Sequence, residues 1–277
     1  MDCRDANFNN PYGVALSAIG LQVDRSVFLA GSFRATGSGH PGAARLYGSK
    51  IGGSLICSGG KFINQTGPAF DGERMQVAMS ANFSNTEVRG NSTDGSMRLY
   101  GTQIGGDLDC GGGNFISMGG PALLADGLKV DGSVFLRNHF CASADSEKVT
   151  VRLVNARIGG DLDCADGKFT NQSGPALHAD AVHVSGSVVL RDNFRAVGRH
   201  DKSGAVRLVS AQVGSALDFR KGKVCNTEGV DLDFSSTSVD TLRLPADTFC
   251  GTAEKDADSS IGNGPIALDG FTYRALS

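Results

Sequence analysis

Four aspartates are the residues of this 277-residue chain whose type and spacing could support catalysis. They form two pairs, each separated by one apolar residue: Asp107 with Asp109 and Asp161 with Asp163. In a β-strand, residues two apart lie on the same face, so each pair would present two carboxylates outward. Such carboxylates could serve glycoside hydrolysis or bind a cation. Because the pairs recur with a longer repeat, we expect solvated turn residues and keep a carbohydrate-active enzyme as an alternative.

Basic residues form the second set of candidates. Four arginines recur at one outward position of the repeat, and three basic residues fall in or beside a long polar stretch: Arg45, Arg98, Arg152, Arg207, Arg195, Arg199 and His200. We predict an interaction surface on these residues, since rigid scaffolds often display recognition residues on loops. An anionic polymer could bind the arginine column. Opposite charges on neighbouring strands, such as Asp71 between Arg45 and Arg98, instead favour a structural ladder.

A repeat of six apolar positions must hold these residues in place. Nine copies begin at successive apolar residues, 26 to 29 residues apart: Leu16, Ala44, Phe70, Met97, Leu123, Val151, Leu177, Val206 and Leu232. Within a copy the apolar residues fall at offsets 0, 2, 5, 7, 11 and 13. Spacings of two are strand periodicity, and the gaps between them are too short for helices. A fixed period of this length indicates a stacked repeat architecture.

The pattern predicts an all-β, right-handed parallel β-helix of about nine coils of 26–29 residues, with three short strands in each coil. Glycine, at 39 of 277 residues, is about twice the usual frequency, and it recurs at the widest corner, as in 159–160. Gly there supplies either a positive φ or close backbone approach. We also expect a phenylalanine ladder at one corner and long polar loops along one edge, every second coil.

Composition and charge exclude several functions. The net charge is −3 with both signs interspersed, which argues against a strong nucleic-acid footprint. No apolar stretch approaches the roughly 20 residues that span a bilayer, and no signal peptide is visible. Four cysteines recur 53 or 54 residues apart and are expected to be buried small hydrophobes: Cys3, Cys57, Cys110 and Cys164. Cys225 and Cys250 alone could meet, and we expect them reduced in a cytoplasmic chain.

Two blocks carry a family resemblance: Arg152 to Cys164, with its Ile-Gly-Gly-Asp-Leu-Asp-Cys end, and Leu268-Asp-Gly-Phe-Thr-Tyr273. Together they resemble bacterial Gly-rich repeat proteins that are often labelled membrane-associated oxidoreductases. The resemblance covers nearly the whole chain and implies a right-handed β-solenoid, followed in longer relatives by membrane helices. The chain contains no dinucleotide, flavin or haem motif, and we expect no cofactor and no metal.

These observations predict a β-helix domain over residues 1–245 and a polar loop with a capping segment over 246–277. The first-ranked function is a non-enzymatic scaffold or protein-interaction module, part of a larger or membrane-linked assembly. A carbohydrate-active enzyme and an end-to-end polymer are the alternatives. We expect a protein partner or self-association, no nucleic acid, and membrane contact only through a region absent from this sequence. The expected location is the cytoplasm, with membrane association through such a region.

Overall fold

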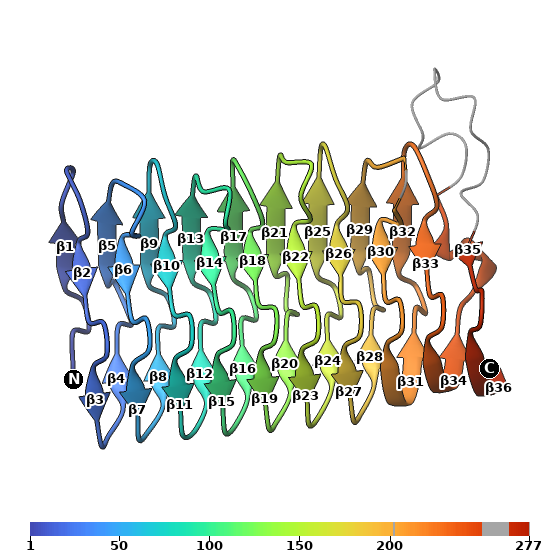
Figure 1. Ribbon diagram of the computed structural model, residues 1–277, viewed down its shortest axis with the longest axis horizontal. Helices are drawn as coiled ribbons and strands as arrows, with labels where there is room; N and C mark the ends of the chain where they lie inside the picture. The colour runs from blue at the N-terminus through green and yellow to red at the C-terminus, as the bar shows by residue number, and fades with distance from the viewer. Residues whose placement is uncertain (202, 251–265, 277) are drawn as a thin grey trace.

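Four short strands per coil build this protein as a parallel β-helix of about nine coils. A computed structural model describes residues 1–201, 203–250 and 266–276. Each turn of the chain passes through the ten-stranded sheet, two rows of the seventeen-stranded sheet and the nine-stranded sheet. Every strand pairs in parallel with its equivalents in the neighbouring coils, so the strands stack in rows along the axis (Figure 1). The repeat predicted from the apolar pattern is confirmed.

Two of the sheets each contribute one strand per coil. The ten-stranded sheet contains β2 (Leu16–Ser17), β6 (Ala44–Arg45), β10 (Phe70–Asp71), β14 (Met97–Arg98), β18 (Leu123–Leu124), β22 (Val151–Arg152), β26 (Leu177–His178), β30 (Val206–Arg207), β33 (Leu232–Asp233) and β35 (Ile266–Ala267). The nine-stranded sheet contains β1 (Asn7–Asn9), β5 (Arg34–Gly37), β9 (Lys61–Asn64), β13 (Glu87–Gly90), β17 (Asn114–Ser117), β21 (Cys141–Ala144), β25 (Lys168–Asn171), β29 (Arg195–Gly198) and β32 (Lys223–Asn226).

The seventeen-stranded sheet holds two parallel rows. The first row is β3 (Gln22–Val23), β7 (Lys50–Ile51), β11 (Gln76–Val77), β15 (Gln103–Ile104), β19 (Lys129–Val130), β23 (Arg157–Ile158) and β27 (His183–Val184). The second row is β4 (Val27–Phe28), β8 (Leu55–Ile56), β12 (Ala81–Asn82), β16 (Leu108–Asp109), β20 (Val134–Phe135), β24 (Leu162–Asp163) and β28 (Val188–Val189). Three longer strands run through both rows and join them: β31 (Gln212–Asp218), β34 (Ser238–Arg243) and β36 (Thr272–Leu276).

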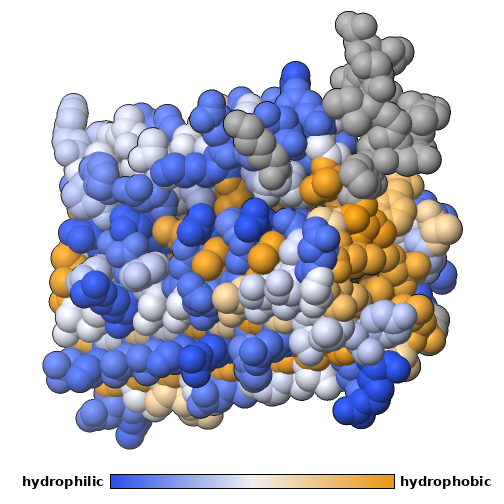
Figure 2. All heavy atoms as spheres, turned by 45° about the vertical axis from the view of Figure 1, so that its right-hand side comes forward, coloured by the Kyte–Doolittle hydropathy of each residue, from blue (hydrophilic) through white to orange (hydrophobic). Residues whose placement is uncertain are grey.

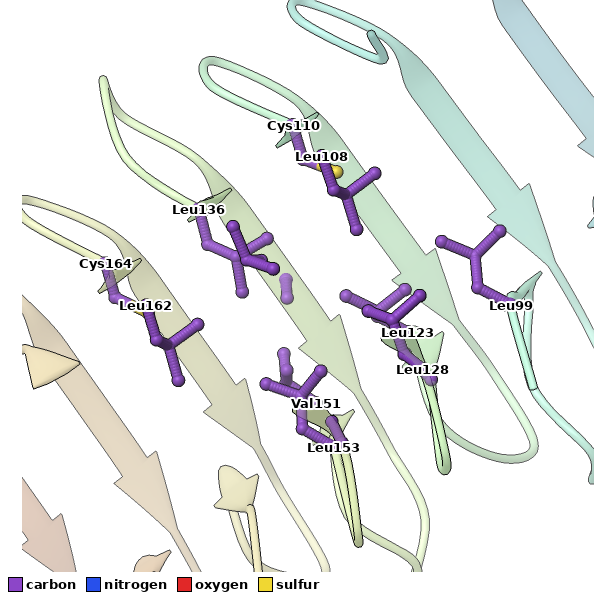
Figure 3. Packing of buried hydrophobic residues seen from close by; sticks show 14 of the residues in the cluster. Leu99, Leu108, Cys110, Leu123, Leu128, Leu136, Val151, Leu153, Leu162 and Cys164 are labelled. Atoms are coloured by element: carbon purple, nitrogen blue, oxygen red, sulfur yellow. The ribbon is translucent and has the colours of Figure 1, made fainter. Parts of the chain in front are cut away.

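The six apolar positions of each copy form one continuous core. In the copy that begins at Val151, all six side chains are at most 1% exposed. Ile104, Ile158 and Val213 lie on one interior line, because the strand register connects them through Val130 and Val184. Leucine and valine side chains of successive coils meet in the interior, with cysteine sulfurs at the same depth (Figure 3). Burial of this apolar surface is the main favourable term in folding.

Glycine is required at the widest corner because the backbones of neighbouring coils approach each other closely. A Cβ atom on Gly159 would overlap the carbonyl oxygen of Asp131 in the preceding coil, and one on Gly214 would overlap that of Ser185. Neither glycine has a positive φ. Of the two reasons predicted for Gly at this corner, close approach is therefore the one that applies.

The phenylalanine ladder exists, but it belongs to a fourth strand that the three-strand prediction missed. Phe115 and Phe169 lie within β17 and β25, whereas Phe140 immediately precedes β21 and leaves the inward strand position to Ala142. Successive rings contact each other edge to face, at 5.0 Å between the centroids of Phe115 and Phe140 and 5.9 Å between those of Phe140 and Phe169. The prediction of three strands and a corner was wrong at this point.

This fourth strand also shortens the predicted loops. The stretches 34–43 and 195–204 begin with β5 and β29, so only the residues after each strand form a loop. The loops still emerge at one edge, between the nine-stranded and ten-stranded sheets, but they do so in every coil (Figure 1). The expectation of long polar loops at every second coil only is therefore corrected.

At the C-terminal end, β35 and β36 extend two sheets by one further strand each. A short 3₁₀ helix, η1 (Ala246–Thr248), precedes Cys250, which is bonded to Cys225 with a Cα–Cα distance of 5.3 Å. The expectation of a reduced pair is thus wrong for this structure. Most of the predicted polar loop lies outside the described residues, and the domain boundary at residue 245 stays a prediction.

Candidate binding groove

Two of the four candidate catalytic aspartates act as hydrogen-bond acceptors at the glycine corner. The Asp107 carboxylate accepts from the Ser133 backbone N–H at 2.8 Å, and the Asp161 carboxylate accepts from that of Ser187 at 2.7 Å. Between them, the Ser133 hydroxyl accepts from the Asp161 N–H at 3.0 Å. These side chains therefore link successive coils by satisfying backbone donors that the turn leaves unpaired.

The other two aspartates lie on the second row of strands, two coils apart. Asp109 accepts a hydrogen bond from the Gly111 N–H, and Asp163 accepts one from Ala165 and pairs with Arg137 at 2.8 Å. Phe135 lies between the two aspartates in the register. The structure does not bring these carboxylates together around a shared cleft, since none of the hollows described below is lined by them.

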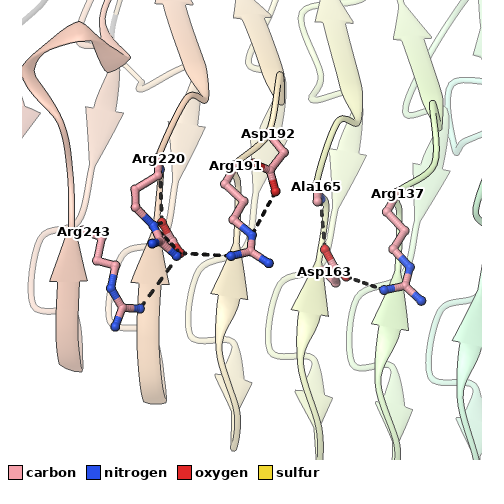
Figure 4. A network of polar contacts seen from close by, with 8 residues as sticks. Arg137, Asp163, Ala165, Arg191, Asp192, Arg220 and Arg243 are labelled. Carbon is pink, nitrogen blue, oxygen red and sulfur yellow. Dashed lines mark hydrogen bonds and ion pairs between the residues drawn. The ribbon is translucent and has the colours of Figure 1, made fainter.

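The row of outward residues that contains Asp109 and Asp163 continues, two coils beyond Asp163, to Asp218. Asp218 is the centre of a buried ionic cluster that the sequence did not indicate. Asp218 is 3% exposed and receives Arg220 at 2.6 Å, with Arg191 and Arg243 at the margin of ion-pair distance (Figure 4). Burial alone would raise the pKa of Asp218, but hydrogen bonds from the Arg220 side chain and backbone outweigh it and lower the pKa. The arginines come from three successive coils, so this cluster joins the last coils of the solenoid to one another.

The predicted arginine column is a ladder of ion pairs, but Arg98 pairs with Glu73 and not with the expected Asp71. Each guanidinium pairs with an acidic residue in an adjacent coil: Arg45 with Asp71, Arg98 with Glu73, Arg152 with Asp126 and Arg207 with Asp180. The Nε–carboxylate distance of the Arg152 pair is 2.6 Å, and Asp126 also accepts from the Val154 N–H at 3.0 Å. Asp180 in addition contacts His178 at 2.9 Å. We call these four arginines and their acidic partners the arginine ladder.

Two of the three basic residues near the loop edge bond to the next coil. Arg195 lies in β29, Arg199 pairs with Glu228 at 2.6 Å, and the His200 backbone exchanges hydrogen bonds with the Asn226 side chain. Their contacts join one loop to the next along the edge. An interaction surface here stays a prediction.

A different face of the molecule carries a long groove. A hollow of about 420 Å³ lies on one side of Arg157 and His183, against Asn155, Ala181 and Ser210. On their other side, two adjoining hollows of about 530 and 310 Å³ follow the first row of strands from β3 to β27. These two share Lys129 and Asp131, so they form one channel parallel to the axis. We call this channel the axial groove. Hydrophilic residues lie in rows along the solenoid, whereas hydrophobic residues gather toward its C-terminal end (Figure 2).

Eight long polar side chains form one column, one from each successive coil, and the first seven of them line one wall of the axial groove. We call them the groove column: Gln22, Lys50, Gln76, Gln103, Lys129, Arg157, His183 and Gln212. Each is the outward residue that precedes an inward valine or isoleucine, and each is exposed. The strand register places them directly opposite one another, so the column extends over roughly 34 Å at standard strand spacing.

The groove column differs from the arginine ladder in its lack of partners. His183 Nδ1 lies 3.1 Å from Gln212 Oε1. Within residues 1–201, 203–250 and 266–276, the other six side chains of the column make no hydrogen bond or ion pair. The opposite wall is low, because it consists of short residues: Asp24, Gly52, Ala78, Gly105, Asp131, Gly159 and Ser185. The column therefore presents free donors and acceptors beside an open channel.

Sequence reasoning missed the groove column, although its signal is present. A Gln, Lys, Arg or His precedes the fourth apolar position in eight consecutive copies, and an acidic residue never does. Strand alternation would have placed these residues on one outward line. Their lack of partners could not be predicted, because it depends on contacts between residues about 26 positions apart.

The cysteine prediction is confirmed for the interior thiols. Cys57, Cys110 and Cys164 are buried and unbonded, and Cys3 is unbonded and partly exposed. Burial raises the pKa of the Cys57, Cys110 and Cys164 thiols, which leaves them protonated and unreactive. Among the described residues, no group of three or more His, Cys, Asp or Glu side chains is placed to hold a metal ion.

In the described part of the chain, no helix combines the length and the apolar character needed to cross a bilayer. Comparison with family models, with curated proteins and with solved structures gave no match to the chain. The resemblance to Gly-rich repeat proteins therefore stays a prediction, and what the structure itself establishes is a parallel β-solenoid.

Proposed function

We propose that this chain is a non-enzymatic binding scaffold that holds an extended polar polymer along its axial groove. The observation that carries the proposal is the groove column, in which polar side chains repeat on eight coils and six of them lack partners within the described residues. A rigid sheet loses little entropy when it binds, because its backbone is already ordered. A straight row of donors and acceptors fits a ligand whose own polar groups recur along a line.

A binding role accounts for the site better than catalysis does. The candidate catalytic carboxylates bond to backbone donors or to arginine, and they lie outside the groove. The scaffold role also accommodates the predicted larger assembly, in which a protein partner or a second copy would use another face. That partner, like the cytoplasmic location, stays a prediction.

A polymer-binding panel tests this function. Linear neutral polysaccharides, acidic polysaccharides, single-stranded DNA and an acidic polypeptide would be compared by affinity electrophoresis with the purified chain. We expect at least one polymer to retard the protein, and its chain length to stay unchanged after long incubation. The double variant Gln76→Ala/Gln103→Ala should bind more weakly.

The matched control lies on the nine-stranded sheet. Lys168 and Thr170 are exposed outward residues of β25, outside the groove. The variant Lys168→Ala/Thr170→Ala should bind like the wild type. Equal losses in both double variants, or no retention by any polymer, would contradict the proposal.

A further inference from the structure

We propose that the ligand of the axial groove is an acidic polysaccharide whose carboxylates lie against Lys129, Arg157 and His183. This inference rests on the function proposed above and narrows it to one class of polymer. It starts from the charges of three successive coils. In the register, Lys129 is directly opposite Arg157, and Arg157 is directly opposite His183.

Two adjacent cations on neighbouring strands repel each other unless an anion lies between them. The arginine ladder solves this problem within the chain, since each of its guanidiniums has an acidic partner one coil away. Lys129 and Arg157 have no such partner among the residues that the structure describes. Even Asp131, in the same hollow, lies beyond ion-pair distance of both. A ligand carboxylate could bridge the two cations and relieve their repulsion.

The rest of the groove column favours hydroxyl groups. Gln22, Gln76, Gln103 and Gln212 offer amides, and an amide can donate to one hydroxyl while it accepts from another. Asp24 and Asp131 on the opposite wall can accept from hydroxyls as well. A chain of sugars presents several hydroxyls on every residue, and a uronic acid adds one carboxylate. The groove therefore combines hydroxyl recognition along its length with carboxylate recognition at Lys129 and Arg157.

The lining disfavours other polymers. Among the described residues that line the three hollows, none is Phe, Tyr or Trp, so nucleobases have no side chain to stack on. The exposed groove column has no apolar stripe, which an amphipathic helix would need.

The test uses polygalacturonate of defined length and the same polymer after reduction of its carboxyl groups to alcohols. Affinities for the full chain would be measured by isothermal titration calorimetry at low salt. The variant Lys129→Gln/Arg157→Gln removes both cations and keeps hydrogen-bonding side chains. Lys168→Gln is the matched control, because Lys168 also faces an arginine, Arg195, but lies outside the groove. Circular dichroism would confirm that each variant is folded.

We expect the double variant to bind polygalacturonate at least about tenfold more weakly, as the loss of one charge-assisted hydrogen bond would produce. The wild type should bind the reduced polymer more weakly than it binds polygalacturonate. The double variant should bind the reduced polymer as well as the wild type does. Lys168→Gln should match the wild type with both polymers.

Three results would overturn the inference. The carboxylate assignment is wrong if both polymers bind equally, or if Lys129→Gln/Arg157→Gln binds polygalacturonate as the wild type does. In that case, weaker binding by Gln76→Ala/Gln103→Ala would still support the proposal that the groove binds a polymer. The polysaccharide assignment fails when oligodeoxythymidylate of similar length binds as tightly as polygalacturonate. Absence of binding by every polymer in both experiments would overturn the proposed function as well.

Discussion

Two outward columns run the length of the same solenoid and look alike in sequence, but the structure treats them differently. In the arginine ladder, each cation pairs with a carboxylate one coil away, as Arg152 does with Asp126. In the groove column, Lys129 and Arg157 are neighbours without an acidic partner in the described chain. Recurrence alone therefore does not distinguish a structural ladder from a binding surface. What distinguishes them is whether the charged side chains have their partners within the chain.

The difference has a physical cause in the shape of the coil. Asp126 and Asp180 lie two residues beyond their strands in the ten-stranded sheet, and each reaches an arginine of the next coil. The residues beyond the groove column fall at the glycine corner, where neighbouring backbones almost touch. The position two residues beyond the groove column is Gly, Ala or Ser in five of the seven coils that line the groove, and such residues cannot neutralise a cation of the column. Asp24 and Asp131 occupy the other two coils, and neither makes an ion pair with the column in the described chain.

The largest expected effect tests the alternation of inward and outward residues on which both columns depend. Ile158 is 1% exposed, so Ile158→Asp would bury an unpaired charge and lower the free energy of unfolding by about 4 kcal/mol or more. The adjacent substitution Arg157→Asp should not lower it, since Arg157 is exposed and the new carboxylate lies opposite Lys129; any gain should stay within about 1 kcal/mol. Urea unfolding measures both. A midpoint for Ile158→Asp close to that of the wild type would contradict the inward assignment.

The second effect compares the two columns directly. Asp126→Ala removes the partner of Arg152 and of the Val154 N–H, and it should cost about 1–3 kcal/mol. Asp131→Ala removes an exposed carboxylate of the groove that has no partner in the described chain, and it should cost less than about 0.5 kcal/mol. Both are measured by the same urea titration. Similar costs for the two variants would show that the groove is not free of internal partners.

The apolar pattern was sufficient to predict the fold because each coil repeats six inward positions that no helix could supply. It was insufficient for the fourth strand. In alternate coils the phenylalanine moves one residue ahead of the strand, as Phe140 does before β21, and the strand keeps only the small Ala142 inside. Because the large side chain lies one residue before the strand, the inward strand position itself carries no large apolar residue, and the apolar pattern did not predict the strand.

The candidate site was less predictable, for a related reason. The outward direction of the aspartate pairs and of the arginines follows from strand alternation. Whether Asp161 is a free carboxylate or an acceptor for the Ser187 N–H depends on the register between coils to within one residue. The sequence determines that register only through the lengths of the corners, which vary from copy to copy.

The third effect is a dependence of stability on pH that belongs to the ladder. Burial alone would raise the pKa of Asp180, but hydrogen bonds and attraction from His178 and Arg207 outweigh it and lower the pKa. A carboxyl group whose pKa is lower in the folded than in the unfolded chain stabilises the fold at a pH above its unfolded value, near 3.9. This stabilisation is lost as the pH falls through the folded pKa.

The stability advantage of the wild type over Asp180→Asn should therefore be full at pH 6 and shrink below about pH 4. Urea unfolding at pH 6, 4 and 3 measures this advantage. The groove variant Gln103→Ala, which changes no titratable group, should differ from the wild type by the same small amount at each pH. An advantage over Asp180→Asn that stays constant to pH 3 would show that Asp180 is not held by its ladder partners.

The smallest expected effect converts part of the groove into a ladder. Lys129→Glu would place a carboxylate directly opposite Arg157 and so replace a repulsive pair with an attractive one. Such cross-strand pairs contribute about 0.2–1 kcal/mol, so the variant should be slightly more stable than the wild type. It should also lose affinity for polygalacturonate, because the new carboxylate occupies the place of the ligand's own. Lys129→Gln, which removes repulsion without adding attraction, should gain less stability. If Lys129→Glu became more stable but still bound polygalacturonate as the wild type does, the free cations would serve neither folding nor binding, and the contrast between the two columns would lose its functional meaning.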